Sequence, residues 1–171
     1  VGHPLPNVEL RIADDDEVVV RGPGMTKGYL HLPEATAELL DEDGWLHTGD
    51  LGALDDEGNL RITGRKKDLI ITAGGKNVAP AEMEAYINQI PGVGQVVVVG
   101  DKMPYLSALV TLDPENLEPL AEAAGVKSGS LEALAKEPAV VDYLMQRVQE
   151  RCNAKVARYQ TIKKIRVLPA E

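Results

Sequence analysis

The chain has 171 residues, 44% of them hydrophobic, and a formal net charge of −9 at pH 7. This length fits one domain or two small ones, and the acidic balance argues against nucleic acid as a general partner. No apolar run approaches the roughly 18 residues of a membrane span. The single cysteine, Cys152, excludes an intrachain disulfide and a cysteine metal cluster. The chain begins at Val1 without a signal pattern, and we interpret it as part of a longer protein.

The first sixty or so residues have the pattern of short strands joined by turns. Apolar and polar residues alternate over Val8–Ile12, which predicts a half-buried strand, and a second strand is expected over Glu17–Val20. A short helix is predicted over Pro33–Leu40, because proline suits the first helical turn. A strand over Leu51–Leu54 leads into the turn-forming segment Asp55–Asn59, which predicts a hairpin.

The rest of the chain mixes helix and strand patterns. Strands are predicted over Leu69–Thr72, Gln95–Val99, Leu106–Leu112 and Ile162–Leu168, and helices over Pro80–Ile90, Pro114–Ala124 and Ala139–Ala157. The run of valines after Gln95 is typical of a well-buried strand, and Cys152 lies on the apolar stripe of the longest helix, which predicts a core position. The predicted fold class is therefore α+β, with a domain boundary near residues 64–67.

Asp50 is the first candidate site residue. It follows Thr48-Gly49, which predicts a tight turn, and its carboxylate could accept charge-assisted hydrogen bonds from the two vicinal hydroxyls of a ribose. The alternative is that Asp50 only caps the turn.

A basic cluster and a glycine pair follow. Arg65 carries a planar fork of donors suited to phosphate or ribose oxygens, although it and Lys67 could equally belong to a solvated basic loop. Gly74 and Gly75 permit positive φ angles and a close approach of a ligand chain to the backbone, with Lys76 next to an anionic group. An ordinary turn between two strands is the alternative.

Three segments, in this order, resemble motifs of the adenylate-forming superfamily, which comprises acyl-CoA synthetases, the adenylation domains of peptide synthetases, and luciferases. Glu17–Leu30, with Pro33–Thr36 after it, is similar to the barrel motif; Gly44–Asp50 is similar to the ribose-binding motif; and Gly64–Glu84 is similar to the hinge and mobile-loop motif. Within the superfamily, the Gly-Gly-Lys-Asn form of residues 74–77 resembles the long-chain and very-long-chain fatty acyl-CoA synthetases.

The resemblance implies roles for these residues. Asp50 would hold the ribose hydroxyls of ATP, Arg65 would contact the same nucleotide, and Lys67 would be the pivot about which a small domain rotates. The Gly74–Lys76 turn would line the tunnel for the pantetheine chain of CoA. A carboxylate and ATP, with Mg²⁺, would give an acyl-adenylate, and the thiol of CoA would then displace AMP. No residue of the chain is expected to bind a metal.

The resemblance also implies a domain organisation. Residues 1–63 would be the end of the β-rich part of a large N-terminal domain, residues 64–67 the hinge, and residues 68–171 a mobile α+β domain that stops before the catalytic lysine segment. The isolated chain is expected to be inactive, because the phosphate-binding loop and the acyl pocket would lie in the remainder of the large domain, its main protein partner.

The expected parent is a cytoplasmic long-chain fatty acid–CoA ligase that takes a fatty acid, ATP and CoA, with peripheral membrane attachment left open and no nucleic-acid partner. One alternative is another adenylate-forming ligase, such as an aryl-CoA or carrier-protein ligase. A second alternative is a non-catalytic interaction module that has kept the fold of the mobile domain.

Overall fold

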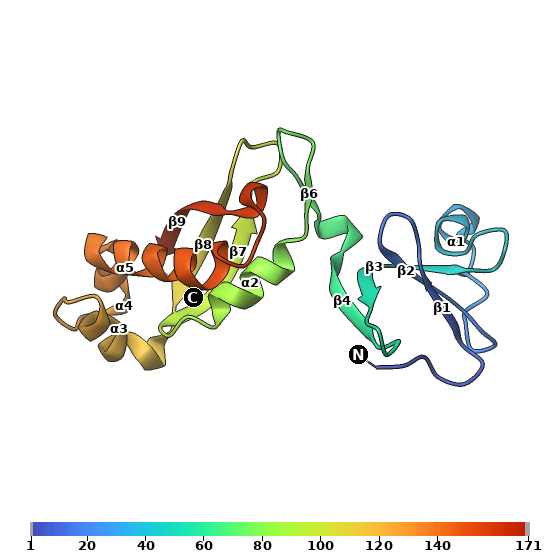
Figure 1. Cartoon of the computed structure of the whole chain (residues 1–171), viewed down its shortest axis with the longest axis horizontal. Helices are drawn as coiled ribbons and strands as arrows, with labels where there is room; N and C mark the ends of the chain where they lie inside the picture. Colours follow the sequence, from blue (N-terminus) through green and yellow to red (C-terminus); the bar gives the residue numbers. More distant parts are fainter. Residues whose placement is uncertain (1, 170–171) are drawn as a thin grey trace. The chain divides into compact units, whose positions relative to one another are not determined.

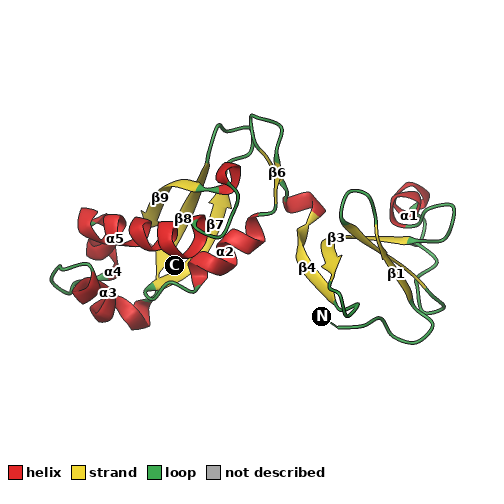
Figure 2. Ribbon diagram, in the orientation of Figure 1, coloured by secondary structure: helices red, strands yellow, loops and turns green. Residues whose placement is uncertain are grey.

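A computed structural model of the chain describes residues 2–169, and its helices and strands are drawn in Figures 1 and 2. The chain divides into two compact units, Val1–Asp68 and Leu69–Glu171. Each unit has its own β-sheet.

The first unit is built on a four-stranded antiparallel sheet in which sequential strands are neighbours. Its strands are β1 (Glu9–Ile12), β2 (Glu17–Arg21), β3 (Leu46–Leu54) and β4 (Leu60–Arg65). The short helix α1 (Pro33–Leu39) connects β2 to β3 and begins at a proline, as its sequence predicts. A 3₁₀ turn, η1 (Lys66–Asp68), follows β4 and ends the unit.

Trp45 is a central packing residue of this unit. Its side chain is 9% exposed, and two guanidinium groups lie over its ring, with the Arg11 Cζ 4.2 Å and the Arg21 Cζ 4.7 Å from the ring centroid. Arg21 also forms an ion pair with Glu9 at 2.7 Å, across β1 and β2. Stacked cations cover the indole with groups that stay hydrated at their outer edges, so a small sheet can bury a large aromatic ring.

The second unit contains a three-stranded sheet and a set of helices. The strands are β7 (Val93–Val99), β8 (Leu106–Leu112) and β9 (Ile162–Leu168); β7 pairs with β8 antiparallel, and β9 pairs with β8 parallel. A two-stranded hairpin, β5 (Ile70–Ile71) and β6 (Asn77–Val78), precedes them. The helices are α2 (Pro80–Asn88), α3 (Leu117–Ala123), α4 (Leu131–Lys136) and α5 (Pro138–Val148), with short turns η2 (Pro114–Asn116), η3 (Gln149–Asn153, π-helical) and η4 (Arg158–Gln160).

The helices α2 and α5 lie against the three-stranded sheet (Figure 2), and the core forms between them. Side chains from the apolar face of α2 and from the inward positions of the strands are fully buried, as are Leu144 and Cys152, which confirms the predicted core position of the cysteine. In β7, Val96 and Val98 are buried but Val97 is 53% exposed. The expectation of a well-buried strand is therefore wrong for three of the five residues 95–99, because one face of β7 lies open to solvent.

The α+β class is confirmed, but several elements differ from the sequence-based expectation. The strand β3 begins at Leu46 and not at Leu51, the expected helix over residues 114–124 starts as the 3₁₀ turn η2, and the longest helix changes from α to π geometry after Val148. The helix α4 was not expected. It is only six residues long, and Ser130, whose hydroxyl accepts a hydrogen bond from the backbone N–H of Ala133, caps its start.

Candidate functional site

Asp50 lies inside β3, at a point where the backbone of the strand is irregular. Gly49 has a φ of +72°, a backbone conformation that residues other than glycine rarely adopt. The hydroxyl of Thr48 donates to the carbonyl oxygen of Val18 at 2.6 Å and accepts from the backbone N–H of Asp50 at 3.1 Å. The tight turn expected at Thr48-Gly49 is thus a distortion within a paired strand, and it fixes the backbone that carries Asp50.

Asp50 and Arg65 are brought together by strand register. They are cross-strand partners in β3 and β4, and the Arg65 Nε donates to the Asp50 Oδ1 at 2.9 Å. The Asp50 side chain is 31% exposed and that of Arg65 is 69% exposed. Because an ionised carboxylate offers about four lone-pair sites, Asp50 keeps acceptor capacity for a ligand beside this ion pair. The two residues expected to contact one nucleotide therefore lie side by side.

A hollow of about 510 Å³ opens beside this strand in the first unit. Thr48 and Gly49 line it from β3, Tyr29 and Leu39 line it from the segment around α1, and Lys67 lines it from η1. The expected pivot residue therefore borders the same hollow as the strand distortion that carries Asp50.

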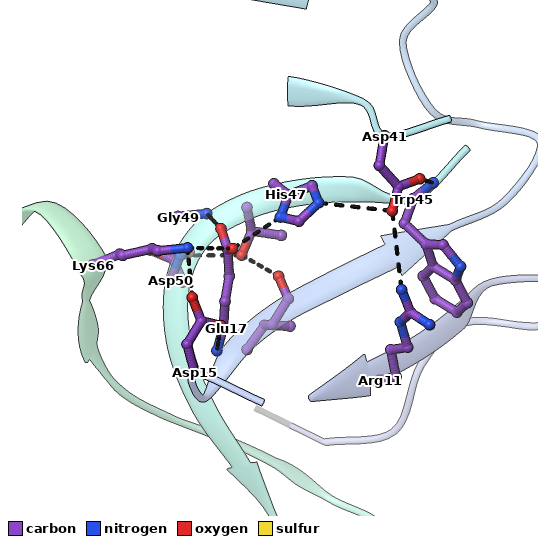
Figure 3. Close-up of polar contacts among 11 residues, drawn as sticks. Arg11, Asp15, Glu17, Asp41, Trp45, His47, Gly49, Asp50 and Lys66 are labelled. Carbon is purple, nitrogen blue, oxygen red and sulfur yellow. Dashed lines mark hydrogen bonds and ion pairs between the residues drawn. The ribbon is translucent and has the colours of Figure 1, made fainter. Parts of the chain in front are cut away.

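A buried carboxylate, Glu17, organises this region (Figure 3). It accepts hydrogen bonds from the His47 Nδ1, the Gly49 backbone N–H and the Lys66 Nζ, each at 2.9 Å. Lys66 also forms an ion pair with Asp15 at 2.7 Å. Three elements, β2, β3 and η1, are thereby joined through one carboxylate.

Burial raises the pKa of Glu17, but the hydrogen bonds from His47, Lys66 and the Gly49 N–H together outweigh it and hold the pKa below its ordinary value. The ion pair with Asp15, followed by that with Glu17, raises the pKa of Lys66. Glu17 is therefore a carboxylate and Lys66 an ammonium at neutral pH. The sequence reasoning missed this cluster. One signal was present: Glu17 is an acidic residue at the start of an otherwise apolar strand.

The other expected site residues lie in the second unit, in the turn that joins β5 to β6. Gly75 has a φ of +70°, and its backbone N–H donates to the carbonyl oxygen of Thr72 at 2.8 Å. A Cβ atom built on Gly75 would meet no atom within 4 Å, and one on Gly74 would meet only the Thr72 hydroxyl at 4.0 Å. Lys76 is exposed. The turn therefore presents bare backbone to solvent with a cation at its end.

Within residues 2–169, no group of three or more His, Cys, Asp or Glu side chains is placed to hold a metal ion.

Known proteins are similar to this chain in sequence and in fold. A family model described as AMP-binding enzyme C-terminal domain matches residues 67–171. The long-chain-fatty-acid–CoA ligase FadD15 of Mycobacterium tuberculosis is 45% identical over 172 residues, which cover 100% of this chain and 28% of FadD15. A dioxo-octahydroindenyl-propanoyl:CoA ligase of the same organism is 56% identical over 99 residues, which cover 58% of this chain and 19% of that ligase.

A solved structure of the O-succinylbenzoate coenzyme A synthetase MenE of Bacillus subtilis, in complex with AMP, matches with a TM-score of 0.68 and 30% identity. The match covers 99% of this chain and 31% of MenE, so the chain spans less than a third of each of these proteins.

The fold is therefore that of the adenylate-forming enzymes, as the three sequence motifs predict. Within that class, the chain belongs to the AMP-binding enzyme C-terminal domain family.

Proposed function

We propose that this chain is the C-terminal part of a fatty acid–CoA ligase that activates a long-chain fatty acid with ATP and transfers the acyl group to CoA. The observation that carries the proposal is the 45% identity to a long-chain-fatty-acid–CoA ligase along the whole chain. The pairing of Asp50 with Arg65 supports it, because it places a carboxylate that can accept from ribose hydroxyls beside a guanidinium that can donate to the same nucleotide.

In the first step, a carboxylate oxygen of the fatty acid attacks the α-phosphorus of ATP, and pyrophosphate leaves. Asp50 accepts hydrogen bonds from the ribose hydroxyls and so fixes the nucleotide relative to β3. Arg65 holds the Asp50 carboxylate through its Nε and leaves its terminal nitrogens free to donate to the nucleotide. Both residues contribute positioning, which is the main protein contribution to displacements at phosphorus.

In the second step, the sulfur of CoA attacks the acyl carbonyl carbon, and AMP leaves with the bonding electron pair. Lys67 acts as the pivot that brings the second unit to the acyl-adenylate, and the Gly74–Lys76 turn then borders the pantetheine chain. The bare backbone at Gly75 allows that close approach. A domain that pivots lets one nucleotide site serve both steps.

ATP and CoA follow from the class of enzyme, and Mg²⁺ is proposed to accompany ATP. The described residues offer no cluster for the metal, and we assign it to none of them. Among residues 2–169, no helix combines the length and apolar character that a bilayer crossing requires. We propose that the full-length enzyme is cytoplasmic. Within it, this chain would work together with the remainder of the large N-terminal domain.

The test is release of AMP by the full-length protein supplied with palmitate, ATP, Mg²⁺ and CoA. We expect AMP and palmitoyl-CoA in equal amounts, and no AMP when CoA and palmitate are both left out. The 171-residue chain alone should release none. Turnover by the isolated chain, or none by the full-length protein with any fatty acid, would contradict the proposal.

A second candidate is a ligase for a different acid. The ring-containing acid named in the 56% identical relative favours it, although that match covers only 58% of this chain. A panel of fatty, aryl and polycyclic acids with the same AMP readout separates the two functions, because each predicts a different preferred acid. If the chain instead belongs to a non-catalytic interaction module, no acid of the panel should give AMP.

A further inference from the structure

Glu17 is the one charged side chain that is buried within residues 2–169, with 3% exposure. Burying a carboxylate is costly unless donors replace its water. Here the donors come from β3, through His47 and Gly49, and from η1, through Lys66. A buried charge joined to two separate elements couples their positions, because displacing either one would leave the carboxylate short of a donor.

The two lysines of η1 differ in their partners. The Lys66 ammonium is held by Glu17 at 2.9 Å and by Asp15 at 2.7 Å. Lys67 is exposed, and within the described part of the chain its side chain forms no hydrogen bond or ion pair. The Lys66 side chain therefore links η1 to Glu17 and Asp15, whereas the Lys67 side chain adds no such link among the described residues.

We propose that the Glu17–Lys66 ion pair is a positioning device that fixes the base of the pivot to the strand carrying Asp50. This inference rests on the proposed function for the existence of a pivot at Lys67. Lys66 confines the rotation to the residues that follow it, and Gly49 keeps the Asp50 segment in the same rigid body. The nucleotide site and the pivot base then hold one geometry while the second unit moves.

The contacts of Glu17 allow the link to Lys66 to be cut alone. The Oε1 atom accepts from the Gly49 N–H, and the Oε2 atom accepts from His47 and Lys66. In Glu17→Gln, the carbonyl oxygen can keep the bond from Gly49, and the amide N–H can donate to His47 in its other tautomer. Lys66 then faces a donor and loses this partner. Lys66→Met removes the same link from the other side, together with the ion pair to Asp15, and keeps the apolar stem.

The experiment is amide hydrogen exchange over residues 65–69 of the full-length protein, expressed as protection factors. We expect protection to fall about tenfold or more in both Glu17→Gln and Lys66→Met, the change expected for a lost charge-assisted hydrogen bond. The double variant should lose no more than Lys66→Met alone, because Lys66→Met has already removed the link to Glu17 together with the ion pair to Asp15. Lys66→Arg, which keeps the charge, should restore protection, and Lys127→Met, at an exposed position of the second unit, is the control.

Rates of the two chemical steps complete the test. In Lys66→Met, CoA-dependent release of AMP from preformed acyl-adenylate should slow more than acyl-adenylate formation, since the rotation separates the two steps. Unchanged protection in both single variants, additive losses in the double variant, or equal slowing of both steps would overturn the inference. Hydrogen exchange can be measured on a protein without enzymatic activity. A protein that releases no AMP would therefore refute the proposed ligase function, and the protection factors would still test the Glu17–Lys66 link. The Lys66 side chain is 45% exposed, so we expect the Lys66 variants to fold. They keep the test possible if Glu17→Gln fails to fold.

Discussion

Arg65 donates a hydrogen bond from its Nε to the Asp50 Oδ1 at 2.9 Å, across neighbouring positions of β3 and β4. The two residues are fifteen positions apart in the chain, and strand register brings them together. The pair holds the Asp50 carboxylate in place, and under the proposed function this would reduce the entropy lost when a nucleotide binds.

Asp50→Ala tests the ribose contact. We expect the KM for ATP in the full-length protein to rise about tenfold or more, because a charge-assisted hydrogen bond worth about 1.5–3 kcal/mol is lost. Steady-state kinetics with varied ATP measures the change. Asp56→Ala, in the exposed hairpin turn, is the control and should leave the KM unchanged. Wild-type ATP kinetics in Asp50→Ala would refute the ribose role.

Lys67→Pro tests the pivot. Proline fixes φ at this residue and restricts the residue before it, so thioester formation should slow more than adenylate formation. Pyrophosphate exchange reports the first step, and CoA-dependent release of AMP reports the second. Lys67→Ala removes the side chain but keeps the backbone free, and it should slow the second step less. If the proline variant lost both steps equally, a rotation about Lys67 would be ruled out.

Gly74 and Gly75 form a matched pair for testing the turn between β5 and β6. Gly75→Ala should destabilise the second unit by about 1 kcal/mol, since alanine is strained at positive φ. Gly74→Ala should change its stability by less than about 0.5 kcal/mol, because its added Cβ meets only the Thr72 hydroxyl at 4.0 Å. Urea unfolding of the 171-residue chain compares them. Equal losses would show that backbone strain does not set the cost.

Cys152 should be unreactive in the folded chain. Its side chain is fully buried, and burial, with a smaller effect of the Glu82 charge, raises the pKa of the thiol to about 11. At pH 8 only about one thiol in a thousand would then be ionised, and the thiolate is the reactive form. A disulfide reagent such as Ellman's should label the native chain more than about a hundredfold more slowly than the chain in denaturant. Rapid native labelling would show that this part of the core opens readily.

Acid should remove the stabilisation that Glu17 provides. Its pKa is lower in the folded state than the ordinary 4.5, so the carboxylate stabilises the fold above pH 4.5, and this contribution is lost as the pH falls through the folded-state pKa. The difference in unfolding free energy between the wild-type chain and Glu17→Gln should therefore shrink below pH 4.5. Urea titrations at a series of pH values measure it. A constant difference would mean that the ionised form is not what stabilises the fold.

Local patterns predicted the regular elements well. The strands β8 and β9 have the expected bounds, and β8 buries every second residue, as its apolar pattern predicts. The exposure of Val97 could not be predicted from its apolar neighbours, since it depends on which face of β7 the helices cover. Asp50 and Arg65 were found through their motifs, but their contact depends on the register of β3 and β4.

Glu17 shows a further limit of sequence reasoning. Its partners His47, Gly49 and Lys66 lie 30, 32 and 49 positions away in the chain, so no spacing rule connects them. The link appears only when β2, β3 and η1 are assembled. Local propensity carries no information on such a contact.

The contact of Trp45 with Arg11 and Arg21 has a practical consequence. It is the only tryptophan of the chain, and it belongs to the first unit, while four of the five tyrosines lie in the second. Selective excitation of the indole therefore gives an emission signal from the first unit alone. Separation of the ring from the two guanidinium groups would change that emission, so the loss of the first sheet can be followed optically while circular dichroism follows the helices of the second unit.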